Sequence, residues 1–373
     1  MSKIKFSGPF SLRLSSFLAI NKIALATYAR HALGRRLERT WDAHFEIGIR
    51  FWRHQFTKAL AMDDIDKGRA LFDSLQTETD DHYAVRRSTS DSPKGVWHHP
   101  ETRSSAATLL YLHGGGYTFH GAVSHRYADM LAHHSGAPLF APDYRLTPEH
   151  PHPAQSDDAF AAWQYLRETV PAKQIVVIGD SAGGHMALSL LQRLKIEGEP
   201  QPALCIGLCP WTDIGDRGAS LHGNDSYDLV QGWMALRFGE WLDPKGTFGR
   251  LALSPIAYDY SGLAPIYLQA GGREILRDMI RDFARAQAAK GADVLLDLWP
   301  DMAHNFQALD STRQSSTEAL QRICAAVEAF AGAGPSMTAG PATEVCHGAV
   351  FSCPDRTEAD AKTSGQFAVQ SSL

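Results

Sequence analysis

The chain has 373 residues, 44% of them hydrophobic, and a formal net charge of −5 at pH 7. Its length and apolar content suffice to bury a large core, and the lack of a basic excess argues against a nucleic-acid-binding protein. Five cysteines, an odd number, do not suggest a disulfide framework, so a reducing, cytoplasmic location is expected.

The first 37 residues are basic, with seven Lys or Arg and no acidic residue before Glu38. Their apolar run, residues 17–29, is interrupted by Asn21 and Lys22 and is too short to span a bilayer. The late position of this run and the lack of a small-residue cleavage site argue against a secretory signal. The sequence favours a plain cap helix here. A basic helix on a membrane surface and an organelle targeting peptide stay open as alternatives.

Residues 1–81 as a whole are helical in pattern and show little strand signal. Trp41, Phe45, Ile49 and Trp52 recur there at helical spacing, which predicts a helix with one apolar face. We expect this face either to roof a site or simply to pack on the rest of the protein.

Residues 82–331 carry an alternating pattern of elements. Two short strands, at 82–87 and 95–98, are predicted as the antiparallel start of a sheet. Further along, short apolar runs alternate with amphipathic helical segments. Such alternation predicts an α/β fold with a mostly parallel central sheet and helices on both faces.

Three glycines follow the apolar run Ala107–Leu112, in the sequence His113-Gly114-Gly115-Gly116. No Cβ stands between such a backbone and a bound molecule, so its N–H groups can approach a substrate closely. We expect Gly115 and Gly116 to donate two hydrogen bonds of an oxyanion hole. His113, at the base of the loop, is expected to be structural rather than catalytic.

The most informative motif is Gly179-Asp180-Ser181-Ala182-Gly183, between the apolar run Ile175–Ile178 and a helix-like segment. A strand that turns sharply into a helix through G-x-S-x-G holds its serine in a strained conformation, with Oγ exposed above the sheet edge. This context predicts Ser181 as a nucleophile. The N–H of Ala182, at the start of the helix, is the third expected oxyanion donor.

Between Pro210 and Pro255 the alternation breaks, and bulky aromatic residues occur among polar ones. An insertion at this place, above the carboxyl edge of the sheet, is typical of a lid. Trp211, Trp233 and Phe238 are candidates for substrate binding, although most aromatic side chains of the insertion are expected to pack its own small core.

The last strand-like run, Val294–Trp299, is followed by His304, from which a general base can reach Ser181 above the sheet. The chain has 17 histidines, so residue type alone is weak evidence and position after the last strand singles out His304. The pairs His98-His99 and His133-His134 lack metal-ligand spacing and are expected at the surface. No metal site is predicted.

The histidine needs a carboxylate to orient it, and both Glu274 and Asp278 follow the preceding strand. We favour Glu274 because it is nearer the strand end, where a loop carboxylate can meet a loop histidine. Asp278 lies one helical turn further on and is expected to cap the helix or to pair with Arg277 or Arg281. Beyond the last helix, residues 332–373 lack periodicity, and their small and polar composition favours a disordered tail.

These motifs together resemble the α/β-hydrolase fold-3 esterases, the hormone-sensitive-lipase-like branch of the α/β-hydrolase superfamily. The resemblance covers roughly residues 84–331 and includes Asp143–Ala154, a near match to the family's DYRLAPEHPFPA segment. Family members more often carry aspartate as the acid, so Glu274 places this chain with a subset that uses glutamate. The resemblance implies a catalytic domain over 82–331, in which Tyr144, Arg145 and Glu149 support the oxyanion loop. It also implies a lid over 210–255, completed by an N-terminal helical cap over 1–81.

The predicted activity is that of a serine carboxylesterase with a Ser181-His304-Glu274 triad, acting on a small ester with a short acyl or acetyl group. No cofactor and no nucleic-acid partner are expected. The same triad also serves lactonases and amide or arylformamide hydrolases, and some hydrolase-like proteins only bind ligands, so these alternatives stay open. Membrane-surface contact through residues 1–37 and a homodimer stay open as well.

Overall fold

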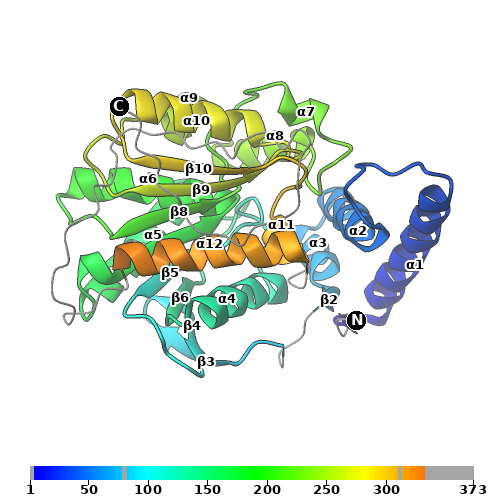
Figure 1. The fold of residues 1–373 in the computed structure, drawn as a ribbon, viewed down its shortest axis with the longest axis horizontal. Helices are drawn as coiled ribbons and strands as arrows, with labels where there is room; N and C mark the ends of the chain where they lie inside the picture. Colours follow the sequence, from blue (N-terminus) through cyan, green and yellow to red (C-terminus); the bar gives the residue numbers. More distant parts are fainter. Residues whose placement is uncertain (1–3, 78–81, 310–312, 332–373) are drawn as a thin grey trace, which may run out of the picture.

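The computed structural model describes residues 4–77, 82–309 and 313–331, and an eight-stranded sheet lies at its centre (Figure 1). In spatial order the sheet runs β10-β9-β8-β7-β5-β6-β4-β3. Its strands are β3 (Val85–Asp91), β4 (Lys94–Pro100), β5 (Thr108–Leu112), β6 (Leu139–Pro142), β7 (Ile175–Asp180), β8 (Leu204–Leu208), β9 (Ile266–Gly271) and β10 (Val294–Trp299). In this order, the neighbouring strands from β10 to β6 are parallel, whereas β4 pairs antiparallel with both β6 and β3. The predicted fold class is confirmed.

The order of the strands determines where a ligand can bind. β6 lies on one side of β5 and β7 on the other, so the sheet grows in both directions from β5. Leu112 at the end of β5 pairs with Gly179 of β7, and Asp180 pairs with Leu208 at the end of β8. The loops after these three strands therefore emerge side by side, at the kind of switch point where open α/β sheets bind ligands.

Helices cover both faces of the sheet because the buried strands are apolar on both sides. In β5, Leu109 and Tyr111 pack into one core cluster, and Leu110 and Leu112 pack into the other. The first cluster includes α4 (Ala122–Ser135) and α12 (Gln314–Ala331), and the second includes α5 (Ala154–Arg167), α6 (Ala182–Glu197) and α10 (Arg277–Ala289). A short helix, α11 (Phe306–Leu309), and a 3₁₀ turn, η1 (Ala172–Gln174), complete this part.

One histidine of the antiparallel edge lies elsewhere than the sequence predicts. His98, on β4, is buried, and its Nδ1 lies 2.7 Å from the Asp129 carboxylate of α4, which also pairs with Arg87. The expectation of a surface position for His98 is wrong because α4 covers this face of the strand and supplies a partner. His133 and His134 are exposed, as predicted.

The N-terminal region consists of α1 (Phe10–Ala32), α2 (Ala43–Leu60) and α3 (Ile65–Phe72), as its helical pattern predicts. Two strands of three residues, β1 (Ile4–Phe6) and β2 (Leu75–Thr77), pair antiparallel and were not predicted, because they are too short to show an alternating pattern. In Figure 1, α1 stands at the edge of the molecule, with α2 between it and the sheet. None of the helices in the described ranges is long and apolar enough to cross a membrane.

The insertion after β8 contains three short helices and a 3₁₀ turn. These are α7 (Ser220–Gly223), α8 (Gly232–Leu242), α9 (Arg250–Leu253) and η2 (Pro255–Ala257). In Figure 1, α7 and α8 lie at the end of the sheet that is nearer to α2. The predicted tail, residues 332–373, lies outside the described residues.

Candidate active site

Ser181 sits at the sharp turn between β7 and α6. Its backbone has φ = 54° and ψ = −116°, a conformation that non-glycine residues rarely adopt and that the motif predicts. The turn brings α6 so close to β5 that a Cβ on Gly183 would come within 1.8 Å of the Leu112 carbonyl oxygen. Glycine at position 183 is therefore needed for the helix to start where it does.

The two glycines predicted as oxyanion donors lie beside Ser181. Gly115 and Gly116 have φ of +95° and +63°, and both line the same cavity as the serine. Ala182 is the first residue of α6, and the first N–H groups of a helix have no acceptor within the helix. The three N–H groups thus come from two adjacent chain segments, both at the carboxyl edge of the sheet.

A buried carboxylate holds this loop in place. Asp180 accepts hydrogen bonds from the N–H of Gly114 at 2.8 Å, the hydroxyl of Tyr111 at 2.7 Å and the amide of Asn305 at 2.7 Å. Burial raises the pKa of Asp180, and the hydrogen bonds from Tyr111 and Gly114 oppose that rise. Asp180 therefore ties the glycine loop, the serine turn and the loop of His304 together, a function that its position inside the motif did not reveal.

The segment that resembles DYRLAPE also supports the glycine loop. The Tyr144 hydroxyl donates to the His113 carbonyl at 2.7 Å, and His113 is itself buried at the loop base. Glu149 accepts two hydrogen bonds, each of 2.7 Å, from Arg69 of α3, while Arg145 pairs with Asp158. Arg69 also donates to the Thr118 carbonyl, so α3 and this segment hold the far end of the glycine loop.

His304 contacts Glu274 and not Asp278. Its Nδ1 lies 3.2 Å from Glu274 Oε2, and both side chains are buried. Asp278 instead accepts from Arg277 at 2.8 Å and from the N–H of Ser220 at 2.9 Å. Burial alone would lower the pKa of His304, but the hydrogen bond with Glu274 and the charges of Asp228 and Glu274 outweigh burial, so that this pKa is raised.

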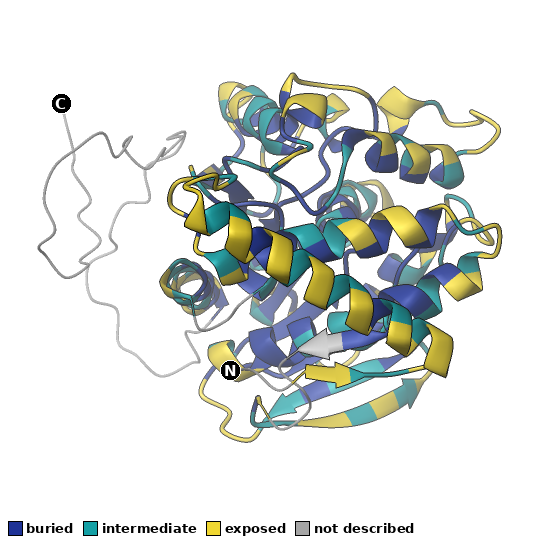
Figure 2. Cartoon of the chain, turned by 90° about the vertical axis from the view of Figure 1, so that its right-hand side faces the viewer, coloured by how far each residue is buried: buried dark blue, intermediate teal, exposed yellow. Residues whose placement is uncertain are grey.

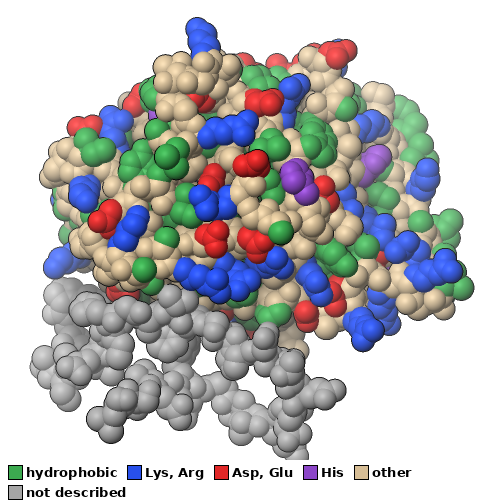
Figure 3. All heavy atoms as spheres, turned by 90° about the horizontal axis from the view of Figure 1, so that it is seen from above, with side chains coloured by type: hydrophobic (Ala, Val, Ile, Leu, Met, Phe, Trp, Pro, Cys, Tyr) green, Lys and Arg blue, Asp and Glu red, His purple; other side chains and the backbone are tan. Residues whose placement is uncertain are grey.

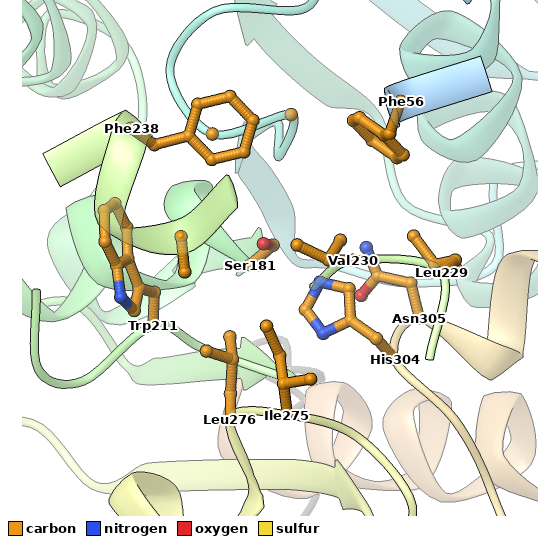
Figure 4. A pocket seen from close by; sticks show the side chains of 13 residues that line it. Phe56, Ser181, Trp211, Leu229, Val230, Phe238, Ile275, Leu276, His304 and Asn305 are labelled. Carbon is orange, nitrogen blue, oxygen red and sulfur yellow. The ribbon is translucent and has the colours of Figure 1, made fainter. Parts of the chain in front are cut away.

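Ser181 and His304 point into one cavity of about 50 Å³, and Phe56 and Phe238 lie over it (Figure 4). In the described part of the chain the two side chains form no hydrogen bond with each other, and such bonds commonly tighten only when substrate is bound. Trp211 also lines the cavity, whereas Trp233 lies outside its lining and is 42% exposed. Phe56 belongs to α2, so the N-terminal region contributes directly to the roof.

Comparison with known proteins identifies the family of the chain. Residues 109–308, more than half of the chain, match the family model described as alpha/beta hydrolase fold. The chain belongs to this family.

Relatives of this α/β hydrolase are esterases. It is 34% identical to an acetyl-hydrolase of Streptomyces hygroscopicus, over 64% of this chain and 79% of the relative. It is 30% identical to an ethyl acetate hydrolase of Pseudomonas putida, over 74% of this chain and 88% of the relative. A solved esterase of the bacterial hormone-sensitive lipase family superposes with a TM-score of 0.71 at 28% identity, over 79% of this chain and 100% of the other. The predicted family branch and the carboxylesterase type of enzyme are confirmed.

The hydrolase has two further buried groups beside His304 that sequence reasoning missed. Asp228, from the insertion, accepts from the N–H of Ile275 at 2.6 Å and from the N–H of Leu229 at 2.6 Å. Burial raises the pKa of Asp228 to about 6; the positive charge of His304 opposes this rise, and the charge of Glu274 adds to it. Asp228 follows no strand and lies in no motif, so the sequence offered no signal for it.

Cys209 is the second such group. Ligand atoms of Cys209, Glu274 and His304 lie within 4.8 Å of one another, close enough in principle to hold a metal ion. A metal needs a thiolate and a neutral imidazole. Burial, followed by the nearby Glu274 charge, raises the pKa of the Cys209 thiol, and the pKa of His304 is also raised. Both shifts disfavour the protonation states that a metal ion would bind.

Proposed function

We propose that this hydrolase is a serine esterase that cleaves short-chain carboxylic esters through an acyl-enzyme. The observation that carries the proposal is the strained Ser181 in one cavity with a buried His304 that is hydrogen-bonded to Glu274. With Nδ1–H donated to Glu274, His304 keeps Nε2 free as an acceptor for the serine proton.

In the proposed reaction Ser181 Oγ attacks the ester carbonyl carbon while its proton moves to His304 Nε2. The N–H groups of Gly115, Gly116 and Ala182 hold the oxyanion of the tetrahedral intermediate. The carbon–oxygen bond to the alcohol then breaks, and the alcohol leaves with the proton from His304. Water attacks the acyl-enzyme with His304 again as base, which releases the carboxylic acid and restores the Ser181 hydroxyl.

The size of the cavity supports a small acyl group. A space of about 50 Å³, closed by Phe56, Trp211 and Phe238, holds a few water molecules or a short acyl chain. Each methylene that fits gains about 0.8 kcal/mol by burial, whereas overpacking a filled pocket costs about 1–3 kcal/mol. The names of the two relatives, acetyl-hydrolase and ethyl acetate hydrolase, point to the same acyl size in those proteins.

Two measurements test this proposal. A fluorophosphonate probe should label the wild-type protein and not the Ser181→Ala variant, and the variant should lose ester turnover without unfolding. A panel of p-nitrophenyl esters, lactones and arylformamides should show the highest kcat/KM for a short ester. Labelling of the Ser181→Ala variant, or its near-wild-type turnover, would exclude Ser181 as the nucleophile. A higher kcat/KM on a lactone or formamide would reassign the substrate class.

A further inference from the structure

The outer face of α1 is mostly apolar and exposed to solvent, with Asn21 as a polar member whose amide donates to the Phe17 carbonyl. Eight of the fifteen large hydrophobic side chains that are exposed in the described ranges fall within residues 4–33, and the most exposed on α1 are Leu25 at 75% and Phe10 at 71%. Figure 2, in which the α1 side of the molecule faces the viewer, shows exposed residues along the foremost helix. We define the α1 outer face by five residues that a helical period places on one side: Phe10, Leu14, Phe17, Leu18 and Leu25.

The opposite side of α1 faces α2, and polar contacts fasten it there. Ser16 and Thr27 are its buried residues, and the Ser16 hydroxyl bonds to Ser74 at 2.6 Å and accepts from Gln55 of α2 at 2.8 Å. The β1–β2 pair holds the chain just before the helix. A helix that is apolar on its exposed side as well is typical of a helix with partners on both sides, so the outer face is a candidate interaction surface.

The charge around the α1 outer face indicates the chemistry of a partner that would cover it. Residues 1–37 carry a net charge of +7 in a chain of −5, which leaves −12 for the remaining residues. Arg13 lies over the ring of Phe10, on the outer face, and Figure 3 shows hydrophobic and basic side chains together at the edge where α1 lies.

The hollow between α1 and α2 adds little free charge to this side of the molecule. This hollow, of about 310 Å³, is lined partly by Arg50, Arg53 and His54. Arg50 pairs there with the buried Glu46, and Arg53 donates to the carbonyl oxygens of Asp228 and Ser226, so both guanidinium groups already have partners within the protein. The charge that a partner can reach is that of Arg13 and Lys22, both exposed on α1, and it favours an occupant that is both apolar and anionic.

We propose that α1 docks this protein on an anionic lipid bilayer, with its outer face among the acyl chains and its basic side chains at the phosphate head groups. A bilayer of this kind supplies both the apolar depth and the negative charge. A symmetric pair of two copies would instead bring two segments of +7 against each other. The helix lies in the plane of the surface and does not cross it. Since α2 lies between α1 and the sheet, the roof of the cavity faces the bilayer side of the docked protein (Figure 1).

The test is co-sedimentation of the full chain with vesicles of phosphatidylcholine, with and without phosphatidylglycerol, at low and high salt. Binding is expected only to the anionic vesicles and is expected to weaken with salt. Leu25→Asp should lower the bound fraction about tenfold or more. Ile196→Asp is the matched control, because Ile196 is equally exposed, at 76%, on α6; its binding should equal that of the wild type. Both variants should hydrolyse a dissolved ester at the wild-type rate, which also shows that they fold.

The charge contribution is tested with a second matched pair. Arg13→Glu combined with Lys22→Glu should abolish binding to anionic vesicles, whereas Lys173→Glu combined with Lys245→Glu, the same change of charge at two exposed positions away from α1, should not. If Leu25→Asp does not fold, Phe17→Asp replaces it. No binding to anionic vesicles at low salt, or equal binding by Leu25→Asp, overturns the proposal. A dimer that Leu25→Asp dissociates, with no vesicle binding, would also overturn it and would assign the face to a second copy.

Discussion

At the scale of single residues, Glu274 and Asp278 allow the acid of the proposed triad to be identified. Glu274→Gln should lower kcat by several orders of magnitude, because an amide neither stabilises the imidazolium of His304 nor fixes its tautomer. Asp278→Asn should change kcat only a few-fold, since Asp278 contacts Arg277 and Ser220 instead. Steady-state kinetics of both variants on a p-nitrophenyl ester measure the ranking, and the reverse order would transfer the role to Asp278.

The pH dependence follows from the raised pKa of His304. As the proposed general base His304 must be neutral, so kcat/KM should fall as the pH drops through a pKa above the ordinary value of 6.5. Asp228→Asn removes a negative charge that favours the imidazolium and should move this acid limb to lower pH. The substitution also costs an acceptor for the Ile275 or the Leu229 N–H, so a lower Tm is expected with it. An acid limb that stays in place in Asp228→Asn would contradict the electrostatic contribution of this carboxylate.

The residues that the sequence could identify are those whose position in the fold is set locally. Ser181 and its strained turn follow from the strand before it and the helix after it, and the three glycines follow from the end of a strand. The positions of Asp228 and His98 depend on contacts between segments far apart in the chain. Asp228 is held by Ile275, and His98 is held by Asp129. No local pattern carries such information.

At the scale of elements, α8 allows the acyl pocket to be tested with its own internal control. Phe238→Ala should shift the kcat/KM optimum to longer acyl chains, because the ring of Phe238 closes the cavity over Gly116. The same change should destabilise the protein by about 3–5 kcal/mol, as for other buried phenylalanines. Trp233→Ala, on the same helix but outside the cavity lining, should leave the chain-length profile unchanged. An unchanged profile in Phe238→Ala would show that another side chain limits the acyl group.

Elements were predictable where the hydrophobic period was long enough to measure. β10 spans the predicted run Val294–Trp299, and β7 begins at Ile175, the start of its predicted apolar run. The helix α4 and the pair β1–β2 were not singled out. α4 is rich in histidine and polar residues, and three-residue strands have no measurable period.

At the scale of the whole molecule, the N-terminal region is fastened to the loops of the site. The Trp41 indole donates to the Asp301 carbonyl at 2.6 Å, and Glu38 forms a salt bridge with Arg273. Arg69 forms hydrogen bonds with Glu149. The roof contributed by α2 is therefore anchored at both sides of the cavity.

Because this roof is anchored, we expect little activity on emulsified triolein and no rise above its critical interfacial concentration, measured by titration of released fatty acid. Efficient hydrolysis with such a rise would show that the roof opens at an interface.

The position of Asp228 has a consequence for how enzymes of this kind can be recombined. The residue belongs to the insertion, yet its carboxylate bonds to the residue after Glu274 and contributes to the proton affinity of His304. An insertion transplanted from a relative would replace part of the cavity lining and one charge near His304 in a single step. Chimeras built to change acyl preference should therefore also change their working pH, unless the graft keeps an aspartate at this position. In this protein, the same insertion affects both the acyl preference and the pKa of His304.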